Sequence, residues 1–153
     1  MQEFLVHLDR LQDAAAIVYE TMAPTPQYPW PLLKSQFGAS IWVKHENHTP
    51  IGAFKIRGGL VYFDDLAKQR DKVTGVIGAT RGNHGQSVGY AAKKYGIPAT
   101  IVVPQGNSRE KNDAMRALGM ELIEHGEDFQ ASRERAGWIA QQRGLHLMPS
   151  FHP

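Results

Sequence analysis

The sequence contains no cysteine among its 153 residues. Disulfides, zinc–thiolate centres and thiol nucleophiles are therefore excluded. No apolar run approaches the ~20 residues of a membrane-spanning helix. The net charge is only +2 and no block of basic residues predicts nucleic-acid binding. The acidic, mixed start Met1-Gln2-Glu3-Phe4 is unlike a signal peptide. We therefore expect a cytoplasmic protein with no membrane or nucleic-acid partner.

The hydrophobic share of 42% is enough for a real core, so the chain is not a disordered one. Apolar residues recur at three- and four-residue steps from residue 3 to about 22, which predicts a helix with the stripe Phe4, Leu5, Leu8, Leu11, Ala15, Val18 and Tyr19. Four prolines between residues 24 and 31 then indicate a stiff surface connector, with Tyr28 and Trp30 as packing anchors.

Strand and helix signals alternate through the rest of the chain. After a short strand at 40–44 and a helix from 54 to about 69, we expect strands at 73–79, 99–103, 120–124 and 145–148. Between them lie helices at 83–95, 109–118 and 129–143, each of which ends at a glycine: Gly96, Gly119 and Gly144. This alternation predicts an α/β fold with a doubly wound, open parallel sheet and helices on both faces.

One lysine has unusual neighbours, in the stretch Gly52-Ala53-Phe54-Lys55-Ile56-Arg57-Gly58-Gly59. A lone lysine is most often a solvated surface residue. Lys55, however, follows an aromatic residue directly and precedes a glycine pair at the predicted start of a helix. A lysine amine can form a Schiff base with a carbonyl cofactor, so this stretch is a candidate catalytic site.

A second polar loop, Thr80-Arg81-Gly82-Asn83-His84-Gly85, follows a buried strand and opens a helix. Successive backbone N–H groups at a helix start can bind a carboxylate or phosphate. Alternatively, Asn83 merely caps the helix and the glycines merely ease a tight turn. Both interpretations stay open on the residues alone. The glycines do not match the dinucleotide or P-loop patterns, which leaves dinucleotide binding weakly supported.

Two histidines in another loop, His45 and His48, have the spacing of a metal pair. No third ligand lies nearby in the sequence, and surface histidines are the commoner explanation. We therefore predict no metal site.

Both loops together resemble the fold-type II pyridoxal-phosphate (PLP) enzymes, and more closely the threonine/serine dehydratase and serine racemase branch. The matching segments are Lys44-x-Glu46, then Pro50-x-Gly52-Ala53-Phe54-Lys55-Ile56-Arg57-Gly58, then Thr80-Arg81-Gly82-Asn83-His84-Gly85-Gln86-Ser87, then Tyr90-Ala91-Ala92. The similarity runs from about residue 35 to the end.

The resemblance implies a role for each residue that matches the family pattern. Lys55 would form the Schiff base with PLP and take the α-proton of the substrate, and Phe54 would lie against the cofactor ring. Asn83 would bind both the phenolic oxygen of the cofactor and the substrate. The substrate carboxylate would be held by the loop residues Thr80, Arg81, Gly82, Asn83 and His84.

The implied reaction removes water and ammonia from a β-hydroxy amino acid, threonine or serine, and gives a 2-oxo acid. Racemases of this branch commonly carry a serine at the position of Arg81 and use it as the second acid/base. Arginine stays protonated and cannot do this, so the dehydratase is favoured over the racemase. The alternative from another class is a non-catalytic α/β module that binds an anionic ligand or a partner.

Length is the main departure from the family, whose members are about twice as long, as two domains require. We predict that residues 1–45 belong to a large domain, that 46–148 form a small α/β domain, and that 149–153 begin the return to the large domain. The glycine-rich loop that cradles the cofactor phosphate is absent, since the longest glycine run is Gly58-Gly59. We therefore expect a truncated chain that is inactive alone, and a homodimer formed through the large domain in the full-length form.

Overall fold

The structure is a computed structural model that describes residues 7–149. The chain divides into two compact units, Met1–Phe54 and Lys55–Pro153, which we describe separately. The domain limits predicted above, at 45/46 and 148/149, stay a prediction. Phe4 and Leu5 of the predicted helix, and residues 150–153, lie outside the described residues.

The first unit contains two helices and a two-stranded ribbon. Helix α1 spans Leu8–Tyr19, strand β1 spans Gln27–Pro29, helix α2 spans Pro31–Phe37 and strand β2 spans Trp42–Lys44, followed by a 3₁₀ turn at Glu46–His48. Strands β1 and β2 pair antiparallel, with Tyr28 opposite Val43. The proline-rich passage is therefore more than a connector, because Pro29 ends an edge strand and Pro31 starts a helix.

Local chemistry explains α2, which the sequence analysis missed. Pro31 occupies the first helical turn, where its lack of an N–H removes no helical hydrogen bond. Gly38 ends the helix in the left-handed conformation, and its N–H donates to the Lys34 carbonyl. Proline breaks a helix from within, but at this first position it favours one.

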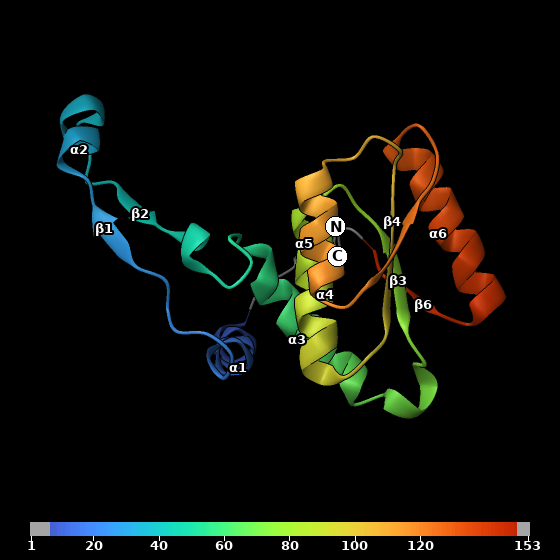
Figure 1. Cartoon of the computed structure of the whole chain (residues 1–153). Helices are drawn as coiled ribbons and strands as arrows, with labels where there is room; N and C mark the ends of the chain where they lie inside the picture. Colours follow the sequence, from blue (N-terminus) through green and yellow to red (C-terminus); the bar gives the residue numbers. More distant parts are fainter. Residues whose placement is uncertain (1–6, 150–153) are drawn as a thin grey trace, which may run out of the picture. The chain divides into compact units, whose positions relative to one another are not determined.

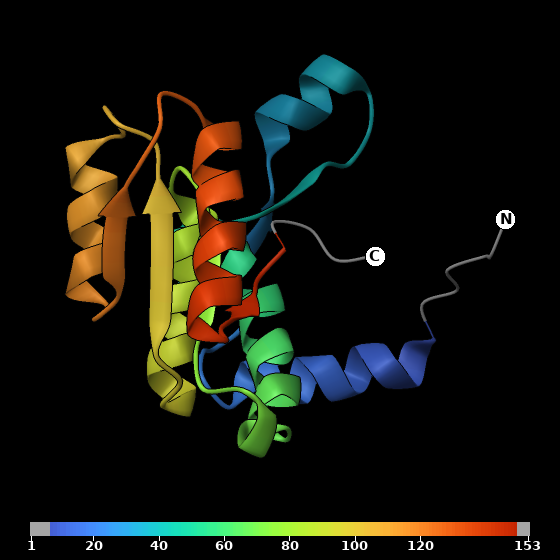
Figure 2. The same cartoon turned by 90° about the vertical axis from the view of Figure 1, so that its right-hand side faces the viewer.

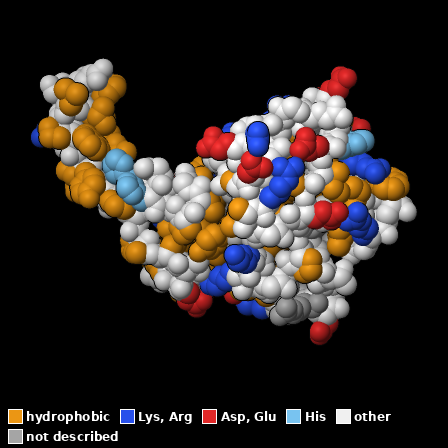
Figure 3. All heavy atoms as spheres, viewed as in Figure 1, with side chains coloured by type: hydrophobic (Ala, Val, Ile, Leu, Met, Phe, Trp, Pro, Cys, Tyr) orange, Lys and Arg blue, Asp and Glu red, His pale blue; other side chains and the backbone are white. Residues whose placement is uncertain are grey.

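Large apolar side chains of the first unit are exposed, including most of the apolar stripe of α1. Leu8 is 65% and Leu11 56% exposed, and only Val18 of α1 is buried. Tyr28 and Trp30 are exposed as well, and their rings contact the ring of His45 at 5.8 and 5.9 Å between centroids rather than a core. Figure 3 shows hydrophobic side chains over β1, α2 and β2.

The second unit is a parallel sheet between two layers of helices. Its elements are α3 (Lys55–Ala67), β3 (Val76–Ala79), α4 (Asn83–Tyr95), β4 (Ala99–Val103), α5 (Arg109–Ala117), β5 (Glu121–Glu124), α6 (Phe129–Arg143) and β6 (His146–Leu147), with a 3₁₀ turn at Arg70–Lys72. The strand order is β5-β4-β3-β6 and every pair is parallel. Helices α3, α4 and α5 lie on one side of the sheet and α6 lies on the other (Figures 1 and 2). The predicted doubly wound α/β fold is confirmed.

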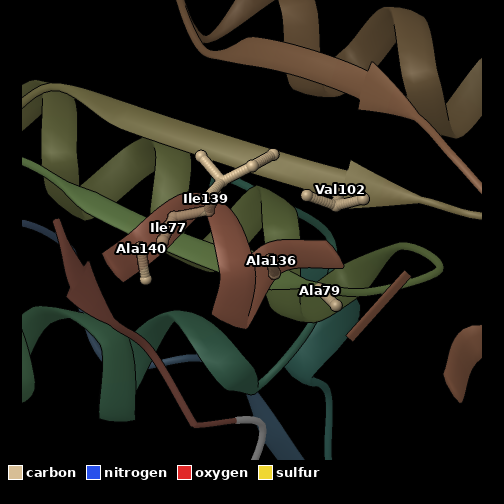
Figure 4. Packing of buried hydrophobic residues seen from close by; sticks show 6 residues of the cluster. All are labelled: Ile77, Ala79, Val102, Ala136, Ile139 and Ala140. Atoms are coloured by element: carbon tan, nitrogen blue, oxygen red, sulfur yellow. The ribbon is translucent and has the colours of Figure 1, made fainter. Parts of the chain in front are cut away.

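The core of this unit is made where α6 packs on the central strands. Ile77, Ala79 and Val102 meet the α6 residues Ala136, Ile139 and Ala140 (Figure 4). All residues of β3 and β4 are buried, which explains their continuous apolar composition. Helices α4 and α6 both end at a left-handed glycine, Gly96 and Gly144, as their sequences predicted.

Strand β3 is the point at which the strand order reverses. The chain moves outward from β3 to β4 and β5, and then returns through α6 to place β6 on the other side of β3. Ligands of open α/β sheets bind outside the carboxyl ends of the strands at such a reversal. The loop that follows β3 is residues 80–82, which places the predicted anion loop at this position.

Helices α3 and α4 pack closely because one glycine permits it. A Cβ atom at Gly59 would overlap with Oγ of Ser87 and would lie 3.2 Å from the Ser87 carbonyl oxygen. The Ser87 hydroxyl donates a hydrogen bond of 2.7 Å to the carbonyl of Lys55. A Cβ atom at the neighbouring Gly58 would meet no other atom within 4 Å, so the two glycines are not equivalent.

This difference predicts opposite effects of alanine at the two glycines. Gly59→Ala should lower the free energy of unfolding by about 1–3 kcal/mol, because the new methyl group forces the helices apart. Gly58→Ala should raise it by up to about 1 kcal/mol, because alanine has the higher helix propensity. Urea denaturation, with the midpoint compared at unchanged slope, measures both. Equal stabilities of the two variants would contradict the close approach of α3 and α4.

Candidate functional site

Lys55 is the first residue of α3, and its side chain is half-buried. Its backbone is held by Ser87 of α4 through the hydrogen bond to its carbonyl oxygen. The lysine is therefore anchored to the helix that begins with the second loop. The sequence stretch around Lys55 gave no indication that Ser87 would be this partner.

The loop after β3 is ordered by its own threonine. Thr80 is buried, and its Oγ1 accepts a hydrogen bond of 3.2 Å from the N–H of Gly82. The N–H of Gln86 donates to the Gly82 carbonyl, which begins the helical hydrogen-bond pattern of α4. The loop thus turns sharply into the helix with little freedom.

The capping interpretation of Asn83 is wrong. Gly82 occupies the N-cap position of α4, and no side chain caps this helix end. Asn83 is already the first helical residue, so its side chain lies past the position from which a cap accepts. Its side chain is exposed. The N–H groups of the first turn of α4 therefore receive no side-chain cap, as an anion site requires.

The two glycines of the loop are needed for packing and not for backbone conformation. Neither Gly82 nor Gly85 lies in the left-handed region, and the φ of Gly82 is 172°, which any residue adopts. A Cβ at Gly82 would lie 2.8 Å from Cδ of Lys111 on α5. A Cβ at Gly85 would lie 2.6 Å from Cγ2 of Thr80 and would overlap with the Met115 sulfur.

His84 connects the loop electrostatically to the lysine. Its Nε2 is buried and has no hydrogen-bond partner among residues 7–149. Burial lowers the pKa of His84 from 6.5, and the positive charge of Lys55 lowers it further. The imidazole is thus favoured in its neutral form beside the lysine, with one ring nitrogen left to interact with a bound group.

The remaining predicted residues lie at the surface. Arg81 is exposed, next to Gly82. Phe54 precedes α3 directly and its ring is 63% exposed, so it is not a core residue. In the second unit the structure thus brings Lys55, Thr80, Gly82 and His84 together around the start of α4. The roles assigned to these residues, and to Phe54 and Asn83, stay predictions.

The structure does not support a metal site at the histidine pair. His45 and His48 lie with ring centroids 6.2 Å apart, and His48 is exposed. No group of three His, Cys, Asp or Glu side chains that could hold a metal occurs among the described residues. In the same part of the chain, no helix is long and apolar enough to cross a membrane.

Lys111 is the residue near the loop that the sequence analysis did not single out. It lies on α5 and its side chain packs against Gly82. Nothing in its local sequence marks it, because the contact joins two helices that are separate in the chain. Only the packing of α5 beside α4 reveals it.

Comparison with known proteins gives consistent results. A family model described as "Pyridoxal-phosphate dependent enzyme" matches residues 18–153. The chain is 35% identical over 137 residues to the biosynthetic L-threonine dehydratase of Haemophilus influenzae, covering 89% of this chain and 26% of that protein. It therefore spans about a quarter of the length of that relative.

Solved structures give the same picture. The processed form of threonine deaminase isoform 2 from Solanum lycopersicum is 29% identical, with a TM-score of 0.81 over 94% of this chain and 42% of that one. Maize serine racemase is 26% identical, with a TM-score of 0.85 over 94% of this chain and 44% of that one.

The lowered pKa of His84 predicts a pH dependence of stability. Well above pH 6.5 the imidazole is neutral in both the folded and the unfolded chain. As the pH falls below 6.5, the unfolded chain binds a proton at this imidazole more readily than the folded chain does. The free energy of unfolding should therefore decrease as the pH falls, until the pH is below the folded pKa. The total decrease is about 1.4 kcal/mol for each unit by which folding lowers the pKa. Denaturant titrations between pH 8 and pH 4.5 should show a smaller fall for His84→Gln.

A matched control is His146→Gln. The pKa of His146 is also lowered by burial, but His146 lies on β6 and bonds to the Tyr62 hydroxyl. The His146→Gln variant should therefore also reduce the decrease in the free energy of unfolding at low pH, independently of His84. An unchanged pH profile for His84→Gln would contradict the burial of a neutral imidazole at this site.

Proposed function

The chain belongs to the fold-type II family of pyridoxal-phosphate dependent enzymes, as its two loop motifs predicted, and we propose that it is part of an ammonia-lyase that removes water and ammonia from threonine or serine. The observation that carries this proposal is the position of Lys55 beside the uncapped start of α4, at the carboxyl end of β3. The names of the relatives support the reaction class, since they include threonine dehydratases 32–36% identical to this chain.

The described residues fit the carbonyl end of the cofactor. A half-buried lysine amine, an exposed amide on Asn83 and a buried, unpartnered Nε2 on His84 surround one helix start. They offer one nucleophile and several neutral polar groups, which suit an aromatic aldehyde with a phenolic oxygen. The chain has no glycine-rich run of the kind that the resemblance assigns to the phosphate.

When bound, pyridoxal phosphate supplies an electron sink that stabilises negative charge at the α-carbon of the substrate. Lys55 would hold the cofactor covalently through Nζ, and its amine would be the base that takes the α-proton. The Ser87 hydrogen bond keeps the backbone of Lys55 fixed while its side chain moves. Proton transfer therefore starts from a defined position.

The loop orients the substrate. N–H groups of the first turn of α4 point at the carboxylate, and the positive end of the helix dipole stabilises its charge. Thr80 keeps the turn in shape through its bond to Gly82. His84, held neutral, adds a polar contact without adding a competing charge. A carboxylate bound there would be held at the helix start next to Lys55.

Arg81 favours elimination over racemisation. A racemase needs a second group that gives a proton to the opposite face of the α-carbon, and arginine does not exchange protons near neutral pH. No other residue of the loop is assigned to that task. We therefore propose a dehydratase rather than a racemase, although serine racemase is among the similar structures.

Cofactor binding tests the proposal directly. Incubation of the chain with pyridoxal phosphate should produce the visible absorbance of a lysine-bound cofactor, and borohydride reduction should place the label on Lys55 in a peptide map. Lys55→Ala should lose both signals, because it removes the amine that forms the bond. Lys72→Ala, an exposed lysine on the 3₁₀ turn after α3, should keep them.

Label that remains after Lys55→Ala would contradict this assignment. Reversible phosphate or carboxylate binding without any reducible link would instead favour the non-catalytic module. Formation of a 2-oxo acid from threonine is the weaker test, because these residues span only about a quarter of the length of the threonine dehydratase that they match.

A further inference from the structure

Thr49 closes a tight turn in the loop that leads to Lys55. The carbonyl of Thr49 accepts a hydrogen bond of 2.9 Å from the N–H of Gly52. Pro50 fits the second position of such a turn because its φ is fixed, and Gly52 adopts the left-handed conformation with a φ of 65°. The backbone of this loop is therefore defined by its own residue types.

The hydroxyl of Thr49 closes the same loop a second time. Its Oγ1 accepts a hydrogen bond of 2.9 Å from the N–H of Ala53 and donates one of 2.9 Å to the Ala53 carbonyl. Both residues are buried, with 7% of Thr49 and 8% of Ala53 exposed. Loss of a hydrogen bond to a buried N–H is costly, because no water replaces the missing acceptor. One hydroxyl thus holds both polar groups of the Ala53 backbone.

This hydroxyl does not act as a helix cap. A capping side chain accepts from an N–H in the first turn of the helix, whereas α3 begins at Lys55 and Thr49 bonds to Ala53, ahead of that helix. The Ser87 hydroxyl holds the Lys55 carbonyl instead. Thr49 therefore holds the main chain before Phe54, and Ser87 holds it after Phe54.

Two residues of the proposed cofactor site follow this turn directly. Phe54 and Lys55 are the next residues after Ala53. Backbone dihedrals that are free to rotate just before Lys55 would spread its amine over more positions. The fixed peptide at Ala53 reduces that freedom before any ligand binds, which is the preorganisation that favours a bond at one site.

We propose that Thr49 is a positioning residue, whose hydroxyl fixes the main chain that enters Lys55 and so favours reaction of the Lys55 amine with an aldehyde. In that reaction the neutral amine forms a C=N bond with the aldehyde carbon, and the aldehyde oxygen leaves as water with both amine hydrogens. The inference rests on the proposed function, because it takes Lys55 to be the residue that binds the cofactor. It assigns a role to a residue that the two loop motifs do not include.

The test compares the labelling of two lysines in the same sample. The full chain is incubated with pyridoxal phosphate and reduced with borohydride at several times, and mass spectrometry of the peptides gives the labelling rate of Lys55 relative to the exposed Lys72. Thr49→Val removes the hydroxyl at nearly constant size, so this ratio should fall about three- to tenfold, the size expected when one or two residues lose their fixed arrangement. Thr49→Ser keeps the hydroxyl and should restore most of the ratio.

Two further variants separate this role from general stability. Gly52→Ala strains the same turn at its positive φ and should also lower the ratio, although the new Cβ meets no other atom within 4 Å. Thr74→Val removes a hydroxyl that donates to the Gly144 carbonyl in the second unit, and it should leave the ratio unchanged. Urea denaturation shows which variants are folded under the labelling conditions.

A folded Thr49→Val variant with the wild-type ratio would overturn the inference, and so would a Thr49→Ser variant that loses as much as Thr49→Val. If Thr49→Val does not fold, an unchanged ratio in Gly52→Ala overturns it in the same way. Absence of any label on Lys55 of the wild-type chain overturns the proposed function, and this inference with it. A labelled Lys55 that is indifferent to Thr49 overturns this inference alone.

Discussion

The hydrogen bond from the Ser87 hydroxyl to the Lys55 carbonyl is the interaction on which the site depends. It exists because α3 and α4 approach so closely that only glycine fits at position 59. The same approach brings Lys55 near enough to His84 for its charge to affect the imidazole. The position of Lys55 is therefore set by the packing of two helices.

The sequence predicted the second unit well because its signals are local. Buried strands of continuous apolar residues, glycines at helix ends and a serine at the start of α5 gave element limits that agree within a few residues at Asn83–Tyr95, Ala99–Val103 and Phe129–Arg143. The order of strands and helices then determined the fold class. The same local reasoning failed at Pro31, where one residue type has opposite effects at the start and in the interior of a helix.

Contacts across the fold could not be predicted in this way. The two loop motifs indicated which residues would matter, but not that Lys111 from α5 would lie over Gly82 or that Ser87 would hold Lys55. Periodicity describes which face of a helix is apolar, not which helix it meets. The first unit shows the same limit, since Leu8 and Leu11 recur at helical spacing and are nevertheless exposed. Exposed apolar side chains lie on α1, β1, α2 and β2.

The glycine at position 82 has a practical meaning for protein engineering. Its φ of 172° lies outside the left-handed region, and the atoms nearest to an added Cβ belong to the flexible end of Lys111. The space at Gly82 can consequently be changed by substituting residue 111 on α5. A shorter residue at position 111 would make room for a side chain at position 82.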